Sequence, residues 1–419
     1  MLTHEDNETL CRVGPGTSMG ELMRRYWIPA VLSEEVAERD GAPARVRLLG
    51  ENLIAFRDTN GRIGLLAENC PHRGASLALG VNGDCGVRCI YHGWKFDVDG
   101  KCVDIPTEPA TSILKERVRA KAYPVHEAGG MVWTYMGAGE PPAFPEFEWF
   151  AYPATHCIPF KVMEDCNYAQ AVEGTIDSAH AGVLHRESPW GGVPKYPHER
   201  DLTPKLEVEN APYGLRYGAV RKMDGDKSHV RITQVVLPFY TFIPPDGAGP
   251  RKDRRLINAF VPRDDVSTWH IQWFFDPTQP IDRAHRIEEG GIHIDKNYRK
   301  LNNIDNWYAQ DRQMMKTQNM SGIKGILVQD HAVSETQGPI LDRTKEHLAS
   351  SDVAVVTWRN QMLRAAKSYA EKQELPSALQ MSIDWSRIKA ATVVFPNEKT
   401  WKDVVPLGEE EKFLPVRAA

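Results

Sequence analysis

Two short motifs in the first quarter of this 419-residue chain carry residues that bind metals, Cys70-x-His72 and Cys89-x2-His92. In a [2Fe–2S] cluster, two thiolates can hold one iron while two neutral imidazoles hold the other. Such a cluster carries less negative charge than one with four cysteines, so it is easier to reduce and suits the transfer of single electrons. The spacing therefore indicates a redox protein.

A structural zinc site is the alternative interpretation, because two cysteines and two histidines are also a zinc ligand set. The neighbouring residues favour the iron–sulfur cluster. Each pair lies in a loop with its own glycine, Gly74 or Gly93, which lets backbone N–H groups approach the bridging sulfides. Pro71 and Trp94 keep water away, and both effects tune the potential of a cluster. We therefore expect a Rieske-type cluster held by Cys70, His72, Cys89 and His92.

A second group, Asp177-Ser178-Ala179-His180 followed by His185, could hold a different metal. Two histidines and one carboxylate are the ligands of non-haem Fe(II) oxygenases, which leave positions open for oxygen and substrate. Residues five apart on a regular α-helix point about 140° away from each other, so His180 and His185 share an ion only if the helix loosens, for which Gly182 offers a place. Two unrelated histidines on a helix are the alternative. We favour the metal site because the electron donor upstream needs an acceptor.

Asp177 precedes His180 by three residues, so on a helix the two side chains are neighbours. A carboxylate there can accept the N–H of a ligand histidine and carry electronic coupling towards another histidine. Plain solvation of Asp177 is the alternative.

The elements that must position these residues change in type along the chain. A capping box, Ser18-x-x-Glu21, predicts a short helix near the start. Strand patterns follow over 46–57 and 63–67, joined by an Asn60-Gly61 turn, and the last strand of this stretch is expected at 130–136. The cluster loops are therefore predicted at hairpin tips of a small all-β domain.

A segment rich in glycine and proline, 137–145, is the best candidate for a linker. Beyond it we expect, in order, a strand near 157–163, a helix over 167–184, several strands between 214 and 275, and helices over 293–318 and 352–372. The predicted fold class is α+β: an N-terminal all-β Rieske domain over residues 1–145 and a larger α+β catalytic domain over 146–419, with an antiparallel sheet flanked by helices.

Composition restricts the function classes. The net charge is only −5 and no strongly basic stripe is present, which argues against nucleic acid as the main partner. The sequence contains no run of about 18 apolar residues and no signal-peptide pattern at its start, so we expect no membrane span and a cytoplasmic location. In that compartment the seven cysteines do not predict disulfides.

The chain resembles the large subunits of the Rieske non-haem iron ring-hydroxylating oxygenases, most closely the phthalate 4,5-dioxygenase-like branch, and the likeness covers nearly the whole chain. In addition to both cluster loops, the similar segments are Met1-Leu2-Thr3-His4-Glu5, Met19-Gly20-x-x-Met23-Arg24-Arg25, Asn167-Tyr168-x-Gln170-x-x-Glu173-Gly174-x-x-Asp177-Ser178-x-His180-x4-His185, Gln329-Asp330 and Gln337-Gly338-Pro339-Ile340-x-Asp342-Arg343.

The resemblance implies details that the residues alone do not. It implies Asp330 as the carboxylate ligand of a mononuclear Fe(II) held by His180 and His185, with Asp342 as the fallback. It also implies a homotrimer, in which the cluster of one subunit faces the iron of its neighbour and Asp177 lies between the two centres. Stacking of two trimers to a hexamer stays open. Electrons are expected from an NADH-dependent reductase that carries a flavin and an iron–sulfur centre.

The function expected from this resemblance is dihydroxylation of an aromatic carboxylic acid, such as a phthalate, with O₂ as the co-substrate. Strand alternation puts Arg221 and Arg231 on sheet faces where either could clamp the carboxylate, and Lys205 is a further candidate. A solvent-facing position is the alternative for each of these side chains. Two other functions stay open: an aryl-ether O-demethylase or ring-hydroxylating monooxygenase on a methoxy- or phenoxybenzoate-like substrate, and a pure electron carrier.

Overall fold

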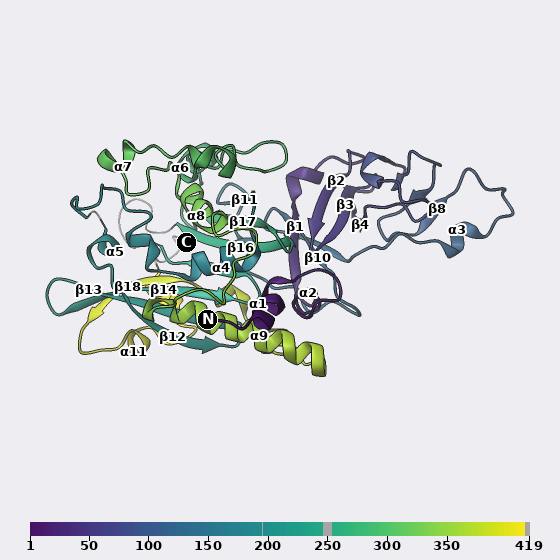
Figure 1. Cartoon of the computed structure of the whole chain (residues 1–419). Coiled ribbons are helices and arrows are strands. Elements are labelled where there is room, and N and C mark those ends of the chain that lie inside the picture. The colour runs from purple at the N-terminus through teal and green to yellow at the C-terminus, as the bar shows by residue number, and fades with distance from the viewer. Residues whose placement is uncertain (195, 246–253, 415–419) are drawn as a thin grey trace. The chain divides into compact units, whose positions relative to one another are not determined.

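The computed structural model describes residues 1–194, 196–245 and 254–414, and the chain divides into two compact units (Figure 1). The smaller unit is Val13–Phe144, and the larger combines Met1–Arg12 with the chain from Pro145 onward. The division into residues 1–145 and 146–419 stays a prediction about domains, but the first twelve residues pack within the larger unit. Among the described residues, no helix is long and apolar enough to cross a membrane.

The smaller unit is built from three small antiparallel sheets, with strand orders β1-β10-β9, β2-β3-β4 and β5-β6-β7-β8. Its elements are α2 (Ser18–Met23), β1 (Trp27–Leu32), β2 (Ala44–Leu48), β3 (Glu51–Arg57), β4 (Ile63–Ala67), β5 (Val81–Gly83), β6 (Gly86–Arg88), β7 (Lys95–Phe96), β8 (Cys102–Asp104), α3 (Leu114–Arg117), β9 (Val125–Ala128) and β10 (Met131–Tyr135). The all-β character predicted for this part of the chain is confirmed, as is the turn at Asn60-Gly61 between β3 and β4.

The apolar core of this unit lies directly beneath the two cysteine–histidine loops. Cys70 and Cys89 are part of the buried cluster that includes Phe56, Leu66 and Phe96. The first loop follows β4 and is closed by the isolated bridge between Asn69 and Ser76, and the second connects the paired strands β6 and β7. Strand pairing thereby holds the ligand-bearing loops in place.

The larger unit contains one antiparallel eight-stranded sheet, with the order β11-β17-β16-β15-β14-β13-β12 and with β18 paired to β14. Its strands are β11 (Cys157–Glu164), β12 (Lys205–Ala211), β13 (Gly214–Lys222), β14 (Lys227–Val236), β15 (Tyr240–Ile243), β16 (Arg255–Asp264), β17 (Ser267–Phe275) and β18 (Ala391–Pro396). Its helices are α1 (His4–Cys11), α4 (Tyr168–Ile176), α5 (Pro197–Arg200), α6 (Arg283–Gly290), α7 (Met314–Thr317), α8 (Ile326–Glu335), α9 (Val353–Lys372), α10 (Ser377–Gln380) and α11 (Trp401–Val404).

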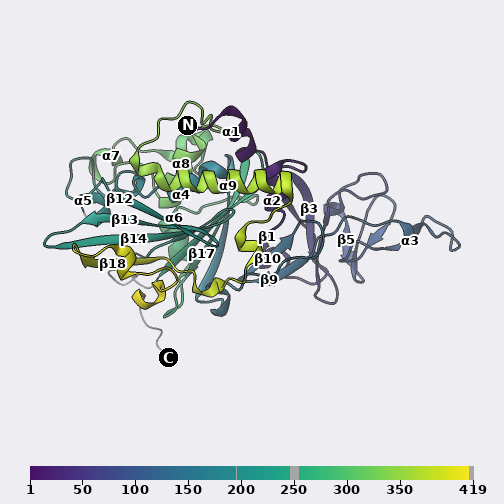
Figure 2. The same ribbon diagram turned by 90° about the horizontal axis from the view of Figure 1, so that it is seen from below.

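Helices α4 and α9 pack on the sheet, and Figure 2 shows the long α9 lying along it. Helix α9 contacts β12 and β13, and α4 contacts β15, β16 and β17. On another face, Trp401 of α11 packs with Val230, Ile232 and Phe395. The predicted α+β class, with an antiparallel sheet flanked by helices, is confirmed.

Two of the predicted helices differ from the structure. The expected helix over 167–184 ends at Ile176, and the stretch over 293–318 contains the short α7, a kinked 3-10 segment at Ile304–Ala309 and turns. In that stretch Trp307, Tyr308 and Ala309 all have positive φ, a conformation that no regular right-handed helix contains. Tyr308 is nevertheless buried, and its hydroxyl donates to Glu335 on α8 at 2.7 Å. Tertiary contacts therefore overrode the local preference for a helix.

One hydrogen bond ties the end of α4 to the sheet. The buried Tyr217 on β13 donates its hydroxyl to the carbonyl oxygen of Ile176 at 2.5 Å. Tyr217→Phe should lower the free energy of unfolding by about 1 kcal/mol, since it leaves a buried carbonyl without this donor. Chemical denaturation followed by fluorescence would measure the loss. Tyr369→Phe on α9 is the matched control, and an equal loss in both variants would contradict the assignment.

Candidate functional site

The two cysteine–histidine loops have the same backbone structure. In the first, Cys70 N–H donates to Ala75 O at 2.8 Å and Gly74 N–H donates to Cys70 O at 2.9 Å. In the second, Cys89 N–H donates to Trp94 O at 2.8 Å and Gly93 N–H donates to Cys89 O at 3.0 Å. Gly74 and Gly93 both have φ of +75°, which side-chain-bearing residues rarely adopt. Two turns with the same hydrogen bonds thus present the two cysteines alike, and the histidine follows its cysteine by two residues in the first loop and by three in the second.

The four side chains of these loops gather at one place. The rings of His72 and His92 lie 4.4 Å apart between centroids, and Trp94 stacks on His72 at 4.4 Å with almost parallel planes. Nδ1 of His72 is buried and has no hydrogen-bond partner among the described residues. Burial, with a further contribution from Cys89, raises the pKa of the Cys70 thiol to about 11. Two buried thiols and an imidazole nitrogen without a partner fit a cluster that would bind them as thiolates and as a neutral donor.

The second predicted group lies where α4 ends. The helix begins with Asn167 as its N-cap, whose side chain accepts from Ala169 N–H at 3.1 Å, and it ends one residue before Asp177. His180–Gly182 is a 3-10 turn, so the regular spacing that would separate His180 from His185 is lost. A Cβ atom at Gly182 would lie 2.2 Å from the carbonyl oxygen of His198. Gly182 is therefore required by close packing against α5 as well as by the end of the helix.

His180, His185 and Asp330 converge on one point. Nε2 of His180 lies 3.2 Å from Nε2 of His185, and Oδ1 of Asp330 lies 3.0 Å from His185 Nε2 and 3.5 Å from His180 Nε2. Bonds of about 2.1 Å to one ion put neighbouring ligand atoms about 3.0 to 3.4 Å apart. The three side chains are partly exposed, so an ion and a substrate can reach them. This group could therefore hold a metal with open positions.

The electrostatics of this group favour a positive charge. Burial alone would raise the pKa of Asp330, but the charge of His185 and hydrogen bonds from both histidines hold it well below its usual range. Burial alone would lower the pKa of His180, yet its contacts with Asp177 and Asp330 raise it to about 10. Because the two carboxylates stabilise a positive charge on His180, the same site also suits a divalent cation.

Asp177 and Gln329 contact the outer nitrogens of the two histidines. Nδ1 of His180 lies 3.6 Å from Oδ2 of Asp177. Nδ1 of His185 lies 2.7 Å from Oε1 of Gln329, whose Nε2 donates to Ile323 O at 2.9 Å and so fixes which amide atom faces the histidine. His185 Nδ1 must then be the donor, which leaves a lone pair on Nε2 for a metal. Sequence reasoning gave no role to Gln329, although it is adjacent to Asp330.

One face of β13 and β14 lies against the segment that carries Asp177 and His180. Strand register pairs Arg221 with His229 and Ala219 with Arg231, so the four side chains share one face. The fully buried guanidinium of Arg221 donates to two backbone carbonyls, Ser178 O at 3.0 Å and Asp201 O at 3.1 Å. Its Nη1 has no hydrogen-bond partner in the described part of the chain.

Arg221 and Arg231 form a cationic group, and two neutral histidines, His198 and His229, accompany them. Burial and the two arginines lower the pKa of His198 to about 3 and that of His229 to about 4, so both rings are neutral at pH 7. The backbone oxygen of His198 would lie 2.2 Å from a Cβ atom at Gly182, which stands between His180 and His185, so this group is near the candidate metal site. Nδ1 of His229 is buried without a hydrogen-bond partner among the described residues. Sequence reasoning missed both histidines, although the alternation that selected Arg231 also includes His229.

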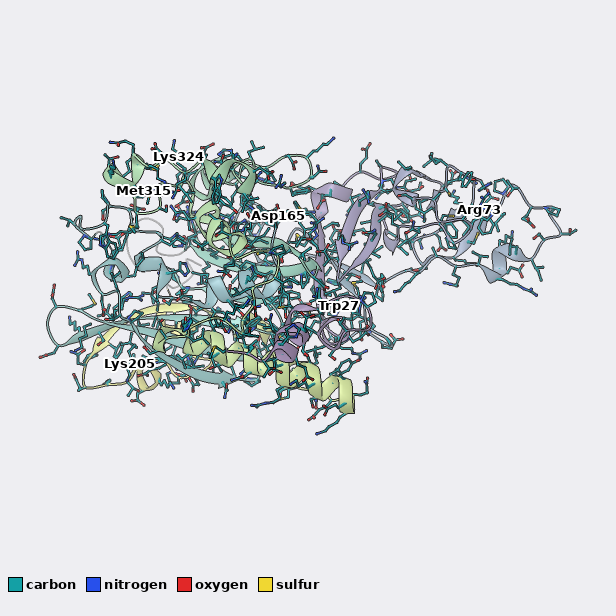
Figure 3. All side chains as sticks on the ribbon, viewed as in Figure 1. Trp27, Arg73, Asp165, Lys205, Met315 and Lys324 are labelled. Atoms are coloured by element: carbon teal, nitrogen blue, oxygen red, sulfur yellow. The ribbon has the colours of Figure 1, made fainter. Side chains whose placement is uncertain are left out.

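Two other candidates lie elsewhere. Lys205, labelled in Figure 3, begins the edge strand β12, and its exposed ammonium pairs with Glu207 at 2.6 Å. Asp342 pairs with Lys345 at 2.9 Å and is not part of the group formed by His180, His185 and Asp330.

Comparison with known proteins matches both units to described families. Residues 26–124 match the Rieske [2Fe-2S] domain, and residues 134–414 match a domain described as LigXa C-terminal domain like. Together the two matches cover most of the chain, including every residue of both candidate sites.

Whole-chain relatives are also present. The chain is 39% identical to the phthalate 4,5-dioxygenase oxygenase subunit of Pseudomonas putida, over 96% of this chain and 94% of the relative. It is 32% identical to the 5,5'-dehydrodivanillate O-demethylase oxygenase subunit of a Sphingobium strain, over 90% of this chain and 84% of the relative. A solved structure of dicamba monooxygenase bound to dicamba is similar in fold, with a TM-score of 0.60 at 20% identity, over 83% of this chain and 99% of that one.

Proposed function

This chain belongs to the Rieske non-haem iron oxygenases, and from this premise we propose that it is an oxygenase component that dihydroxylates an aromatic carboxylic acid such as a phthalate. We infer that its electrons come from an NADH-dependent reductase with a flavin and an iron–sulfur centre. We also infer a homotrimer, as the family resemblance implies, and the mass of the protein in solution tests that inference.

Cys70, His72, Cys89 and His92 are proposed to hold the [2Fe–2S] cluster, and His180, His185 and Asp330 the mononuclear iron. When bound, the cluster supplies single electrons and the ferrous ion supplies the place where O₂ is reduced. Asp177 Oδ2 lies 3.6 Å from Nδ1 of His180, so its charge favours a proton on that nitrogen and a lone pair on Nε2. Gln329 does the same for His185.

Gln329 gives a testable prediction about the metal site. Gln329→Leu should weaken binding of the ferrous ion by about 10- to 100-fold, because the tautomer of His185 is no longer fixed. Gln329→Glu retains an acceptor for Nδ1 and should bind iron nearly as well as the wild type. Iron retained at graded chelator concentrations, normalised to the visible absorbance of the cluster, measures both variants. Equal retention by Gln329→Leu and the wild type would remove this role from Gln329.

The substrate class rests mainly on one observation, the buried guanidinium of Arg221 with its Nη1 unpartnered. Among the described residues no carboxylate forms an ion pair with Arg221 or Arg231, and Asp201 offers only its backbone oxygen to the Arg221 guanidinium. A buried cation without a paired anion is costly unless a ligand supplies the anion. A carboxylate matches the planar donor geometry of arginine, and a neutral His229 can donate a further hydrogen bond.

An aryl-ether O-demethylase or ring-hydroxylating monooxygenase is the second candidate function. Similarity to an O-demethylase oxygenase subunit across most of the chain favours it. The cationic group serves this function equally well, because a methoxybenzoate also carries a carboxylate. The two candidates therefore differ in the fate of oxygen and not in the recognition of the acid.

Isotope labelling separates them. Purified protein with a matched reductase, NADH and ¹⁸O₂ would be supplied with a panel of benzoates, phthalates and methoxybenzoates. Dihydroxylation gives a dihydrodiol that contains two labelled oxygens. A single labelled oxygen, or an unlabelled phenol formed with release of formaldehyde, would favour the monooxygenase. If no member of the panel were oxygenated, an aromatic acid would be contradicted as the substrate.

A further inference from the structure

A second group of two histidines and a carboxylate lies in the interior of the larger unit. It consists of Glu164 at the end of β11, His270 on β17 and His331 on α8, and all three are buried. One nitrogen or oxygen from each side chain lies within 4.8 Å of the others. These are the same residue types as those in the proposed iron site.

The geometry of this group is that of a hydrogen-bonded network and not of a metal site. Nδ1 of His270 lies 2.8 Å from Nε2 of His331, which is a hydrogen-bond distance and shorter than the spacing of about 3.0 to 3.4 Å between two ligands of one ion. The buried ammonium of Lys300 acts on both Glu164 and His331 and would repel a cation. The group therefore connects elements of the protein to one another.

The neighbours of His270 fix the direction of its hydrogen bonds. Its Nε2 lies 3.0 Å from Oδ1 of Asn258, an oxygen that also accepts from Gln272 Nε2 at 2.9 Å. His270 must then donate from Nε2 and accept at Nδ1, so His331 donates its Nε2–H to His270. Oε2 of Glu164 lies 3.5 Å from the same nitrogen of His331. Strands β16 and β17 thus hold the imidazole of His331 in one orientation.

His331 follows directly after the two residues of α8 that serve the metal site. Gln329 contacts His185, and Asp330 is the proposed carboxylate ligand. One helical turn beyond His331, Glu335 accepts from Lys300 Nζ at 2.7 Å, from Tyr308 at 2.7 Å and from the backbone N–H of Asp165 at 3.0 Å. His331 and Glu335 therefore make polar contacts on the face of α8 next to the one that presents Asp330.

We propose that His270 is a positioning residue, which holds His331 and through it sets the rotation of α8 that presents Asp330 and Gln329 to the metal. A rotation of about 10° about the helix axis moves a side-chain oxygen some 5 to 6 Å from that axis by about 1 Å. Functional groups tolerate displacements of only about 0.5 Å. Apolar packing of Leu327 and Val328 resists such a rotation weakly because it lacks direction, whereas the hydrogen bonds of His331 and Glu335 are directional, and that of His331 lies nearer to Asp330 along the helix.

This inference rests on the proposed iron site, and its test is the iron content of the holoenzyme. His270→Phe keeps a ring of similar size but removes the acceptor for His331. His270→Asn restores an acceptor close to the position of Nδ1. Phe260→Leu is the matched control, since the Phe260 ring packs on His270 at 4.3 Å between centroids and makes no side-chain hydrogen bond. Each variant is assayed for iron beyond that of the cluster and for the EPR signal of the ferrous–nitric oxide adduct.

We expect His270→Phe to bind the ferrous ion about 10-fold more weakly and to give an altered EPR signal, with the absorbance of the cluster unchanged. His270→Asn should recover most of the binding, and Phe260→Leu should bind as the wild type does. Wild-type affinity in His270→Phe, or an equal loss in Phe260→Leu, would overturn the positioning role. A further metal ion that is lost with His270 would overturn it in favour of a second metal site. A wild type without mononuclear iron would instead contradict the proposed function.

Discussion

Replacing His180 by alanine should abolish oxygenation while the visible spectrum of the Rieske cluster remains. His180 Nε2 lies within 3.5 Å of both His185 Nε2 and Asp330 Oδ1, so its removal leaves only two of the three proposed ligands. Turnover is expected to fall by at least about 1,000-fold, because oxygen activation requires the bound ion. Product formation with a matched reductase measures the loss, and the absorbance and EPR spectra of the reduced cluster measure what is retained.

Two further variants test whether the loss in His180→Ala is specific to the metal site. His293→Ala removes another histidine of the same unit, whose side chain is 44% exposed and lies outside the candidate site, so it should keep full activity. Asp330→Asn keeps the size of the third proposed ligand but removes its charge, and it should behave as His180→Ala does. If His180→Ala still oxygenated its substrate, the mononuclear site would be wrongly assigned. A pure electron carrier would show no oxygenation in any variant, including the wild type.

The sequence predicts features that depend on neighbours in the chain and fails for those that depend on distant contacts. The cluster loops are local, since the ligands, the glycine and the first hydrogen bond of each turn lie within six consecutive residues. His180 and His185 are also local, but α4 ends at Ile176, before either histidine, and a 3-10 turn at His180–Gly182 stands where the sequence predicted a helix that loosens at Gly182. These parts could be predicted because turn chemistry and ligand spacing act over short distances.

Asp330 could not be chosen from the residues alone, because its distance from His185 depends on how α8 packs. Only the family resemblance selected it from the many acidic residues, and the structure brings it within 3.0 Å of His185 Nε2. The burial of Arg221 could not be predicted from the residues alone either. Alternation assigned it to a face of the sheet, but the sequence could not show that this face turns towards Ser178 and leaves the guanidinium without a carboxylate partner.

Arg221 carries the second large prediction, because it is the buried cation proposed to bind the carboxylate of the substrate. Arg221→Ala should raise the KM for the aromatic acid by about 100- to 1,000-fold, since truncating one partner of a buried charged pair costs about 3 to 4 kcal/mol. The value of kcat should change less, because the carboxylate is bound in both the ground state and the transition state. Steady-state kinetics over a range of substrate concentrations separate the two parameters.

Burial also predicts how the other cations should compare. Arg231 is less buried than Arg221, so water screens its charge more and Arg231→Ala should have a smaller effect on KM. Lys205 is 78% exposed and pairs with Glu207, so Lys205→Ala should leave KM unchanged and serves as the control for loss of positive charge. An order of effects in which Lys205 exceeded Arg221 would place the carboxylate at the sheet edge and not beside the metal.

A neutral analogue distinguishes loss of recognition from damage to the fold. Arg221 donates to Ser178 O and Asp201 O, so its removal also loosens the segment that carries Asp177 and His180. If only recognition is lost, kcat/KM for the amide of the same acid should change little, because the amide never supplied the anion that the guanidinium requires. An equal loss for acid and amide would mean that Arg221 supports the segment and does not bind the carboxylate. Arg221→Lys keeps the charge but not the planar pair of donors, and it should recover only part of the affinity for the acid.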